Sequence, residues 1–398
     1  MIMAETFLKA KILTSGVTFS DTALEYALKH NAKKQNMVYN APVNAERIRP
    51  QELFLTHYDG YRTVVSCVAP CSPNPVQIMA EGEKLLAKVE DQYVEDVDIT
   101  FVQEPSYYQQ KISTGTYAKE FVSACGYDEL NIIPWKGCDI SKGCLFCGSN
   151  VIASESEHEI LNAHTISTSD AWEKKKDTYL RDLMEAIHLA KNAACYEDHM
   201  HVIIISGDLC DVKLDYQSEI YAQIAEKIYP EVKEKAKEGI VAVLMPPKNF
   251  DLLKKMRQSG IDKVVFNLEV GNELLFNRYC PGKHNIGYHH ILNALLESVN
   301  IWGAGNVWTN FVLGLEPIDG LLAFNASLAK EGIVSSANVL HLDKGNRLDC
   351  GVPSYDTVIK YFYELALILK ENNQLPFYCS LALRTSLSNE AYQGRIVL

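Results

Sequence analysis

The pattern of hydrophobic and polar residues changes character near residue 130. From there on, short runs rich in β-branched residues alternate with longer amphipathic runs of helical periodicity. Repeated strand and helix units form parallel sheets with crossover helices, and six or more units suggest a barrel. The sequence therefore predicts an α/β fold with a whole or partial (β/α) barrel of parallel strands. The expected strands lie at 131–135, 201–207, 240–246, 263–270, 307–316 and 336–342.

The first part of the chain has a different pattern. Helical stretches are expected at 21–34 and 77–93, on either side of a hairpin pattern at 52–70 whose Asp59-Gly60 supplies the turn. We therefore expect a small α+β N-terminal region over residues 1–115. Residues 116–398 are expected to form the barrel core, with a C-terminal helical extension.

Composition narrows the class of protein. The 398 residues are 47% hydrophobic, enough for a large core. A net charge of -12 repels nucleic acid and anionic membranes. The charge therefore does not support either of them as a binding partner. The N-terminus lacks the pattern of an export signal, and nowhere do 18 uncharged apolar residues run together. The expected location is the cytoplasm.

Three cysteines form the strongest chemical signal. Cys138, Cys144 and Cys147 are separated by five and then two residues, in the loop after the first expected barrel strand. That loop lies on the face where (β/α) barrels hold their active sites. Three thiolates hold zinc only with a fourth ligand, for which Cys125 is a candidate, whereas an iron–sulfur cluster can leave one iron open for a small molecule. The spacing predicts a metal centre and favours a cluster over zinc.

The remaining cysteines carry weaker signals. An odd total of eleven in a large chain without an export signal argues against a disulfide framework. Cys195, Cys280 and Cys379 are interpreted as small buried hydrophobes. Cys67 and Cys71 are too few for an auxiliary cluster and are interpreted as part of a loop at the hairpin end.

The segment from Cys138 to Cys147 resembles the cluster loop of the radical S-adenosylmethionine enzymes. In that family a cysteine triplet holds a [4Fe–4S] cluster whose fourth iron binds the cosubstrate. The aromatic Phe146 matches the usual C-x3-C-x-aromatic-C pattern, and the first gap is two residues longer. This C-x5-C-x2-C form is similar to the maturation proteins of the iron-only hydrogenase, within the biotin synthase-like branch. The resemblance covers roughly residues 130–345 and implies that Cys138, Cys144 and Cys147 bind the cluster.

The resemblance also implies contacts with S-adenosylmethionine at three later strand ends, which come in the family's order. Taken alone, a Ser-Gly-Asp sequence after a strand also fits an ordinary turn and helix cap. The implied contacts are Ser206, Gly207 and Asp208 near the methionine ammonium, Asn267 and Glu269 on the ribose hydroxyls, and Val312 and Gly314 against the adenine.

The implied activity is reductive cleavage of S-adenosylmethionine to a 5′-deoxyadenosyl radical. The radical would take hydrogen from a small-molecule substrate in a biosynthetic or cofactor-maturation pathway, with a reductant such as flavodoxin or ferredoxin. Two alternatives stay open: radical methylation, and a zinc- or cluster-binding protein without radical chemistry. No catalytic residue is identified. Candidates for substrate contact are Arg278, Lys283, His341, Asp343 and Arg347.

Overall fold

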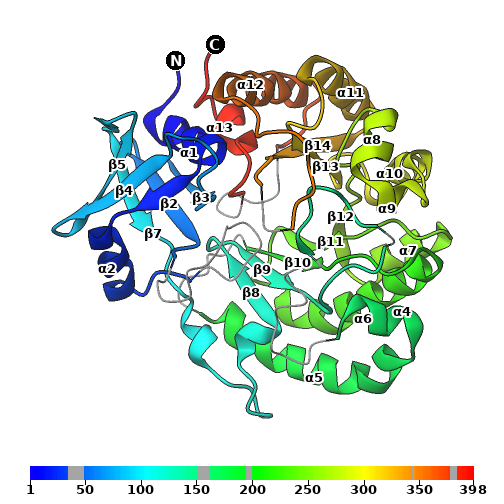
Figure 1. The fold of residues 1–398 in the computed structure, drawn as a ribbon. Helices are drawn as coiled ribbons and strands as arrows, with labels where there is room; N and C mark the ends of the chain where they lie inside the picture. The colour runs from blue at the N-terminus through cyan, green and yellow to red at the C-terminus, as the bar shows by residue number, and fades with distance from the viewer. Residues whose placement is uncertain (35–48, 141, 150–160, 194–199, 343–344, 377–382) are drawn as a thin grey trace.

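The largest part of the fold is a seven-stranded sheet. The structure is a computed structural model, which describes residues 1–34, 49–140, 142–149, 161–193, 200–342, 345–376 and 383–398. The strand order is β14-β13-β12-β11-β10-β9-β8 (Figure 1). Strands β9 to β14 are parallel, and β8 pairs antiparallel with β9. The predicted α/β fold with a partial barrel of parallel strands is confirmed. The strands are β8 (Val122–Cys125), β9 (Glu129–Ile132), β10 (His201–Ile205), β11 (Gly239–Val243), β12 (Ile261–Val265), β13 (Val307–Leu313) and β14 (Ile333–Val339).

Helices follow the strands and lie around the outside of this sheet (Figure 1). Their apolar positions recur at helical spacing and turn inward; in α7, for example, Leu253 and Met256 are fully buried. The helices are α4 (Ala163–Thr168), α5 (Ala171–Lys191), α6 (Leu214–Val232), α7 (Asp251–Gln258), α8 (Glu273–Tyr279), α9 (Pro281–His284), α10 (Tyr288–Trp302), α11 (Ile318–Lys330), α12 (Tyr355–Glu371) and α13 (Ser388–Tyr392).

Two smaller sheets form from the N-terminal residues. One has the order β3-β2-β7 and the other β1-β4-β5-β6. The predicted hairpin is present, and its turn closes with a 2.9 Å bond from the Gly60 amide to the His57 carbonyl. The elements are α1 (Ala4–Ser15), β1 (Val17–Phe19), α2 (Asp21–Lys29), β2 (Glu52–His57), β3 (Arg62–Ser66), β4 (Val76–Glu81), β5 (Lys84–Val89), β6 (Gln92–Tyr93) and β7 (Val97–Phe101).

The helix predicted over residues 77–93 is wrong, because this segment forms strands β4, β5 and β6. Gly82, with a φ of 61°, makes the turn between β4 and β5. Glu90 and Asp91 adopt positive φ before β6. Helix-favouring Glu, Lys and Leu residues suggested a helix, but pairing with β1 and burial of Ile78 and Ala87 favour the sheet.

The N-terminal region joins both edges of the large sheet. At one edge the Val339 amide of β14 donates to the Thr385 carbonyl at 2.8 Å, and the next carbonyl, of Arg384, accepts from Ser66 of β3 at 3.1 Å. At the other edge, Lys33 donates to the Ala124 carbonyl of β8 at 2.5 Å. The sheet β3-β2-β7 therefore lies between β14 and β8.

A buried carboxylate, Glu52 of β2, sits at this junction. It is fully buried, forms ion pairs with Arg384 and with Lys33 (3.2 Å), and accepts from the Cys125 thiol at 3.7 Å. Burial alone would raise the pKa of Glu52, but the charges of Lys33 and Arg384 outweigh it and lower the pKa. Lys33, Glu52 and Arg384, which lie in three segments distant in sequence, thus form one buried ionic group.

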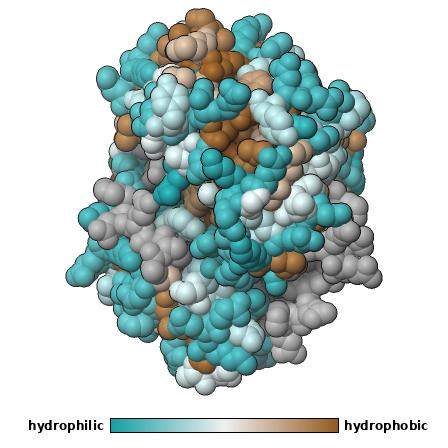
Figure 2. All heavy atoms as spheres, turned by 90° about the vertical axis from the view of Figure 1, so that its left-hand side faces the viewer, coloured by the Kyte–Doolittle hydropathy of each residue, from teal (hydrophilic) through white to brown (hydrophobic). Residues whose placement is uncertain are grey.

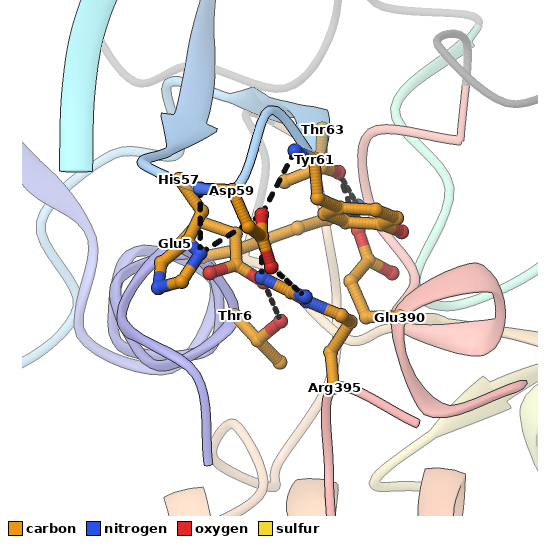
Figure 3. Close-up of polar contacts among 9 residues, drawn as sticks. Glu5, Thr6, His57, Asp59, Tyr61, Thr63, Glu390 and Arg395 are labelled. Carbon is orange, nitrogen blue, oxygen red and sulfur yellow. Dashed lines mark hydrogen bonds and ion pairs between the residues drawn. The ribbon is translucent and has the colours of Figure 1, made fainter. Parts of the chain in front are cut away.

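A second polar cluster joins the two ends of the chain (Figure 3). Arg395 donates to Glu5 at 2.8 Å and to Asp59 at 2.6 Å. Nearby, the buried Lys9 donates to Glu390 at 2.7 Å, and Glu390 also accepts from Thr63. Helix α1 and the β2–β3 hairpin are therefore fixed to α13.

Figure 2 shows the face that lies on the left-hand side of Figure 1. This face is largely hydrophilic, with hydrophobic residues gathered toward the end where both termini lie. Met1, Val397 and Leu398 are among the exposed large hydrophobic residues of the described chain. None of the helices in the described ranges has the length and apolar character needed to cross a membrane.

Replacing Glu52 by Gln should destabilise the protein by about 3 kcal/mol, because Lys33 and Arg384 would stay buried without their counter-charge. Denaturant unfolding measures the loss. The lowered pKa makes the contribution of Glu52 complete above the ordinary carboxyl range and lost as pH falls through the lowered value. The variant should therefore be less acid-sensitive than the parent.

Glu83→Gln serves as the matched control, since it breaks an ion pair with Lys29 in which both side chains are well exposed. Little change in stability is expected there. Equal losses in the two variants would contradict the role assigned to Glu52.

Candidate metal centre

The carboxyl ends of the parallel strands meet at one edge of the sheet. Asp208 follows β10, Glu269 follows β12 and Gly314 follows β13. The three predicted ligand cysteines lie in the segment that follows β9, and so at the same edge. The topology alone therefore brings together most of the residues that the sequence singled out.

Three hydrogen bonds with two other segments hold the cysteine loop. The Asp139 amide donates to the Asp208 carbonyl at 2.8 Å. The Leu145 amide donates to the Tyr279 carbonyl at 2.8 Å, and the Gly143 carbonyl accepts from the Gly282 amide at 3.3 Å. The loop is thus fixed at its start by the end of β10 and in its middle by the junction of α8 and α9.

Arg347 adds a fourth attachment. Its guanidinium donates to the carbonyls of Lys142 (2.7 Å) and Cys144 (3.2 Å), and its amide donates to the Leu145 carbonyl at 2.7 Å. Its charged group was predicted to contact substrate. In the structure it supports the backbone of the cysteine loop.

Gly207 allows the loop to approach the end of β10. A Cβ atom at this position would lie 2.1 Å from the Gly137 carbonyl oxygen and 2.9 Å from the Cys138 Cα. Ser206 donates to the Trp135 carbonyl at 2.9 Å, and the Trp135 indole donates to the Gly207 carbonyl at 2.6 Å. These two predicted cosubstrate residues therefore pack the cysteine segment directly.

Two of the three cysteines are half-buried and the third is exposed. Cys138 and Cys144 are half-buried, and Cys147 is exposed with its sulfur 2.9 Å from the Ser149 hydroxyl. Burial raises the pKa of the Cys138 thiol to about 12, so this group keeps its proton until a metal displaces it.

The donor set fits an iron–sulfur cluster. In a [4Fe–4S] cluster each thiolate binds a different iron, so its sulfurs stand farther apart than around one ion. Cys144 lies near both other cysteines, since its charge acts on Cys138 and on Cys147. The loop therefore offers three soft sulfur ligands of the kind that a cluster needs.

Asp208 is held in a fixed orientation. Its Oδ1 accepts from the Gln217 amide at 3.0 Å and from the Met245 backbone amide at 2.8 Å. Burial is the main cause that raises the pKa of Asp208, with the Lys283 charge acting in the opposite direction. The carboxylate is thus held by two bonds, one from α6 and one from the segment that follows β11.

Asn267 and Glu269 lie beyond the end of β12, in an extended run in which they are partly exposed and their neighbours Phe266, Leu268 and Val270 are fully buried. The regular strand ends earlier than predicted, because Glu269 has a φ of 66° and forms only an isolated bridge with β13.

Lys283 is a buried cation at the centre of this group. It donates to Glu269 at 2.7 Å and to the Asn267 carbonyl at 3.0 Å. Burial opposes its charge, but Glu269, Cys144 and Asp208 together outweigh burial and raise the pKa of Lys283. A permanently charged ammonium therefore lies among the carboxylates and thiols.

Three further residues were predicted to contact the cosubstrate: Phe146, Val312 and Gly314. Phe146 is half-buried against the hydrophobic core. Val312 is buried in β13. Gly314 has a φ of 122°, and a Cβ there would lie 2.9 Å from Pro353. The positive φ and the close approach of Pro353 thus require a glycine here, independently of any bound cosubstrate.

Four further residues named in the sequence analysis have different outcomes. Arg278 forms an exposed ion pair with Asp349 at 2.7 Å. His341 follows β14 and bonds to the Val339 carbonyl at 3.0 Å. Asp343 lies outside the described residues. Cys125 is wrong as a fourth ligand, because it pairs with Glu129 at the opposite end of β9 and is covered by Glu52.

The sequence interpretation missed Cys280 as a site residue. It is fully buried, and its interaction with Cys144, together with burial, raises the pKa of the Cys144 thiol. The signal was present in its position: Cys280 precedes Pro281-Gly282 in the connection that follows β12, on the side of the sheet where the site lies.

A parallel α/β sheet with three cysteines at its carboxyl edge is the arrangement expected of a radical S-adenosylmethionine enzyme. No protein-family model matches the chain. The chain is similar to bacteriochlorophyllide c C-7(1)-hydroxylase of Chlorobaculum limnaeum, with 27% identity over 227 residues. The match covers 54% of this chain and 53% of the relative, so the chain spans about half the length of the curated relative it matches.

The chain is also similar to solved structures. The FeFe-hydrogenase maturase HydG of Carboxydothermus hydrogenoformans has a TM-score of 0.41 and 14% identity, over 63% of this chain and 53% of that one. A radical SAM methyltransferase of Sphaerobacter thermophilus has a TM-score of 0.38 and 13% identity, over 76% of each chain.

Replacing Gly207 by Ala should displace the cysteine loop, since the added methyl group overlaps the Gly137 backbone. We expect a loss of about 1 to 3 kcal/mol in stability and a reduced iron content after anaerobic reconstitution. Iron and sulfide analysis with thermal unfolding measures both. Gly351→Ala is the control, because nothing lies within 4 Å of its Cβ position. Full iron binding by Gly207→Ala would contradict this packing role.

Proposed function

We propose that the protein is a radical S-adenosylmethionine enzyme acting on a small organic molecule. Cys138, Cys144 and Cys147 would hold a [4Fe–4S] cluster. When bound and reduced, the cluster supplies the electron that cleaves S-adenosylmethionine into methionine and the hydrogen-abstracting 5′-deoxyadenosyl radical. A one-electron reductant such as flavodoxin or ferredoxin is part of the proposal.

The observation that carries the proposal is the fixed position of the cysteine loop. Backbone bonds from Asp208, Tyr279 and Gly282 and the guanidinium of Arg347 hold it against the strand ends. Three sulfur ligands on a tethered loop, beside oriented polar groups at the carboxyl edge of a parallel sheet, match what a cluster and its cosubstrate need.

The chain's own residues would bind and orient the cosubstrate. Asp208, oriented by Gln217 and Met245, would accept from its ammonium group. Asn267 and Glu269 would contact the ribose hydroxyls, which requires Glu269 to share its carboxylate between the sugar and Lys283. The Lys283 ammonium is also placed to attract a carboxylate.

Further groups would complete the cosubstrate site. Phe146, Val312 and Gly314 would border the adenine, while Ser206 and Gly207 keep the cysteine segment close to the end of β10. The enclosure matters because a radical must be kept away from water and side reactions.

The similar hydroxylase of Chlorobaculum limnaeum supports only a broad class of substrate for this chain. That protein is named as a hydroxylase of a bacteriochlorophyllide, and this chain spans about half of it. We carry over only a small organic substrate with a C–H bond to be activated, in a biosynthetic or cofactor-maturation pathway. His341, at the end of β14, remains a candidate for contact with it.

The decisive test uses protein reconstituted with iron and sulfide without oxygen. With S-adenosylmethionine and a strong one-electron reductant, it should form 5′-deoxyadenosine and methionine in equal amounts. Cys144→Ala should lose the cluster and this activity. Cys71→Ala, which removes a half-buried thiol bonded to Thr14 in the N-terminal region, should retain both. Intact cosubstrate in the presence of a full cluster would count against the proposal.

Product analysis also separates the alternatives. S-adenosylhomocysteine formed together with 5′-deoxyadenosine would indicate radical methylation. One equivalent of zinc and no iron after anaerobic purification would indicate a binding protein without radical chemistry.

Replacing Asp208 by Asn should weaken cosubstrate binding about tenfold, since the amide keeps the shape but loses the charge that attracts an ammonium group. Iron content should stay at the parent value. Equilibrium binding of S-adenosylmethionine to the reconstituted protein measures the change. An unchanged affinity would mean that Asp208 only orients Gln217 and Met245.

A further inference from the structure

The pairing between β12 and β13 changes register where the two strands reach the site. Val265 pairs with Trp308, and the next pair along the chain is Glu269 with Phe311. Three residues that follow β12 therefore lie opposite two residues of β13. One extra residue in a strand is a β-bulge, which bends the strand and redirects its side chains, and bulges are common next to active sites.

Two side chains supply hydrogen bonds across this bulge. The Leu268 amide donates to the hydroxyl of Thr309, a residue with no exposed surface, at 3.0 Å. The Asn310 amide donates to the Oδ1 atom of Asn267 at 3.2 Å. Backbone pairing then returns, since the Glu269 amide donates to the Asn310 carbonyl at 3.0 Å. Side chains therefore supply bonds at the point where the register changes.

The same bonds orient the carboxamide of Asn267. Its oxygen accepts from the Asn310 backbone amide at 3.2 Å and from the Asn310 side chain at 3.1 Å. Because both bonds go to the oxygen, the NH2 group of Asn267 is the part that can donate to a ligand.

The bulge also redirects Glu269. Phe311, which pairs with Glu269, packs on Phe324 of α11 with 6.1 Å between the ring centroids. Glu269 instead adopts a φ of 66°, and its carboxylate accepts from Lys283 of α9 at 2.7 Å. An amide donor and a carboxylate acceptor are thus presented from positions two residues apart.

From this geometry we infer that Thr309 and Asn310 are positioning residues, which hold the bulge so that Asn267 and Glu269 meet the two ribose hydroxyls of the cosubstrate. The inference rests on the proposed function and names the residues that set up its ribose contacts. A hydroxyl group both donates and accepts, so an amide donor beside a carboxylate acceptor matches a pair of adjacent hydroxyls.

The test compares the equilibrium binding of S-adenosylmethionine with that of its 2′,3′-dideoxy analogue, on reconstituted protein without reductant. The parent should prefer the natural compound by about tenfold, because the analogue leaves polar groups of the site without partners. Thr309→Val keeps nearly the same shape but cannot accept from the Leu268 amide, so the preference should fall severalfold. Thr309→Ser restores the acceptor and should restore most of the preference.

Ser335→Ala is the matched control. Ser335 is the partner of Thr309 on β14 and is equally buried, and its hydroxyl has no hydrogen-bond partner within the part of the chain that the structure describes. The control should keep the parent's preference. Asn310→Ala removes one of the two donors to Asn267 and should lower the preference by a smaller factor than Thr309→Val. If Thr309→Val does not fold, Asn310→Ala decides the question.

Iron and sulfide content and thermal unfolding are measured for each variant. An unchanged preference in Thr309→Val and Asn310→Ala would overturn the inference while leaving the proposed function intact. An equal loss of affinity for both compounds would also overturn it, because a general structural change does not distinguish the ribose hydroxyls. A parent that binds both compounds equally would remove the ribose contacts and the inference together. If the parent takes up no cluster, the proposed function fails first.

Discussion

The large sheet ends in two edge strands, β8 and β14, and a single buried charge couples both edges to the N-terminal region. Glu52 pairs with Lys33, which also bonds to β8, and with Arg384, whose neighbour Thr385 bonds to β14. A carboxylate with no exposed surface is tolerated only when opposite charges neutralise it. The two edges of the large sheet are therefore joined through this small ionic group.

Most polar groups at the site are held in place by a hydrogen bond from another residue. Asp208 is oriented by Gln217, Glu269 by Lys283, and the cysteine loop by Arg347. Lys283 supplies a positive charge where carboxylates and thiols converge. Without it, binding a further negatively charged group there would be opposed by every neighbour.

Much of the barrel was predictable, because strands buried on both faces leave continuous apolar runs and the helices between them have helical periodicity. The segment 77–93 was not, since its strand state comes from pairing with β1 rather than from local preference. The cysteine triplet, Asp208 and Glu269 could be singled out by sequence spacing and resemblance. The bonding role of Arg347 could not, because contacts between segments far apart in sequence leave no local pattern.

The attachment of the cysteine loop has a consequence for the order of synthesis. Its partners at Tyr279, Gly282 and Arg347 are translated long after the cysteines themselves. Chains are made from the N-terminus, and domains fold as units. While the ribosome is still at work, the nascent loop therefore lacks most of its tethers, and it can reach its bonded position only when nearly the whole polypeptide has emerged.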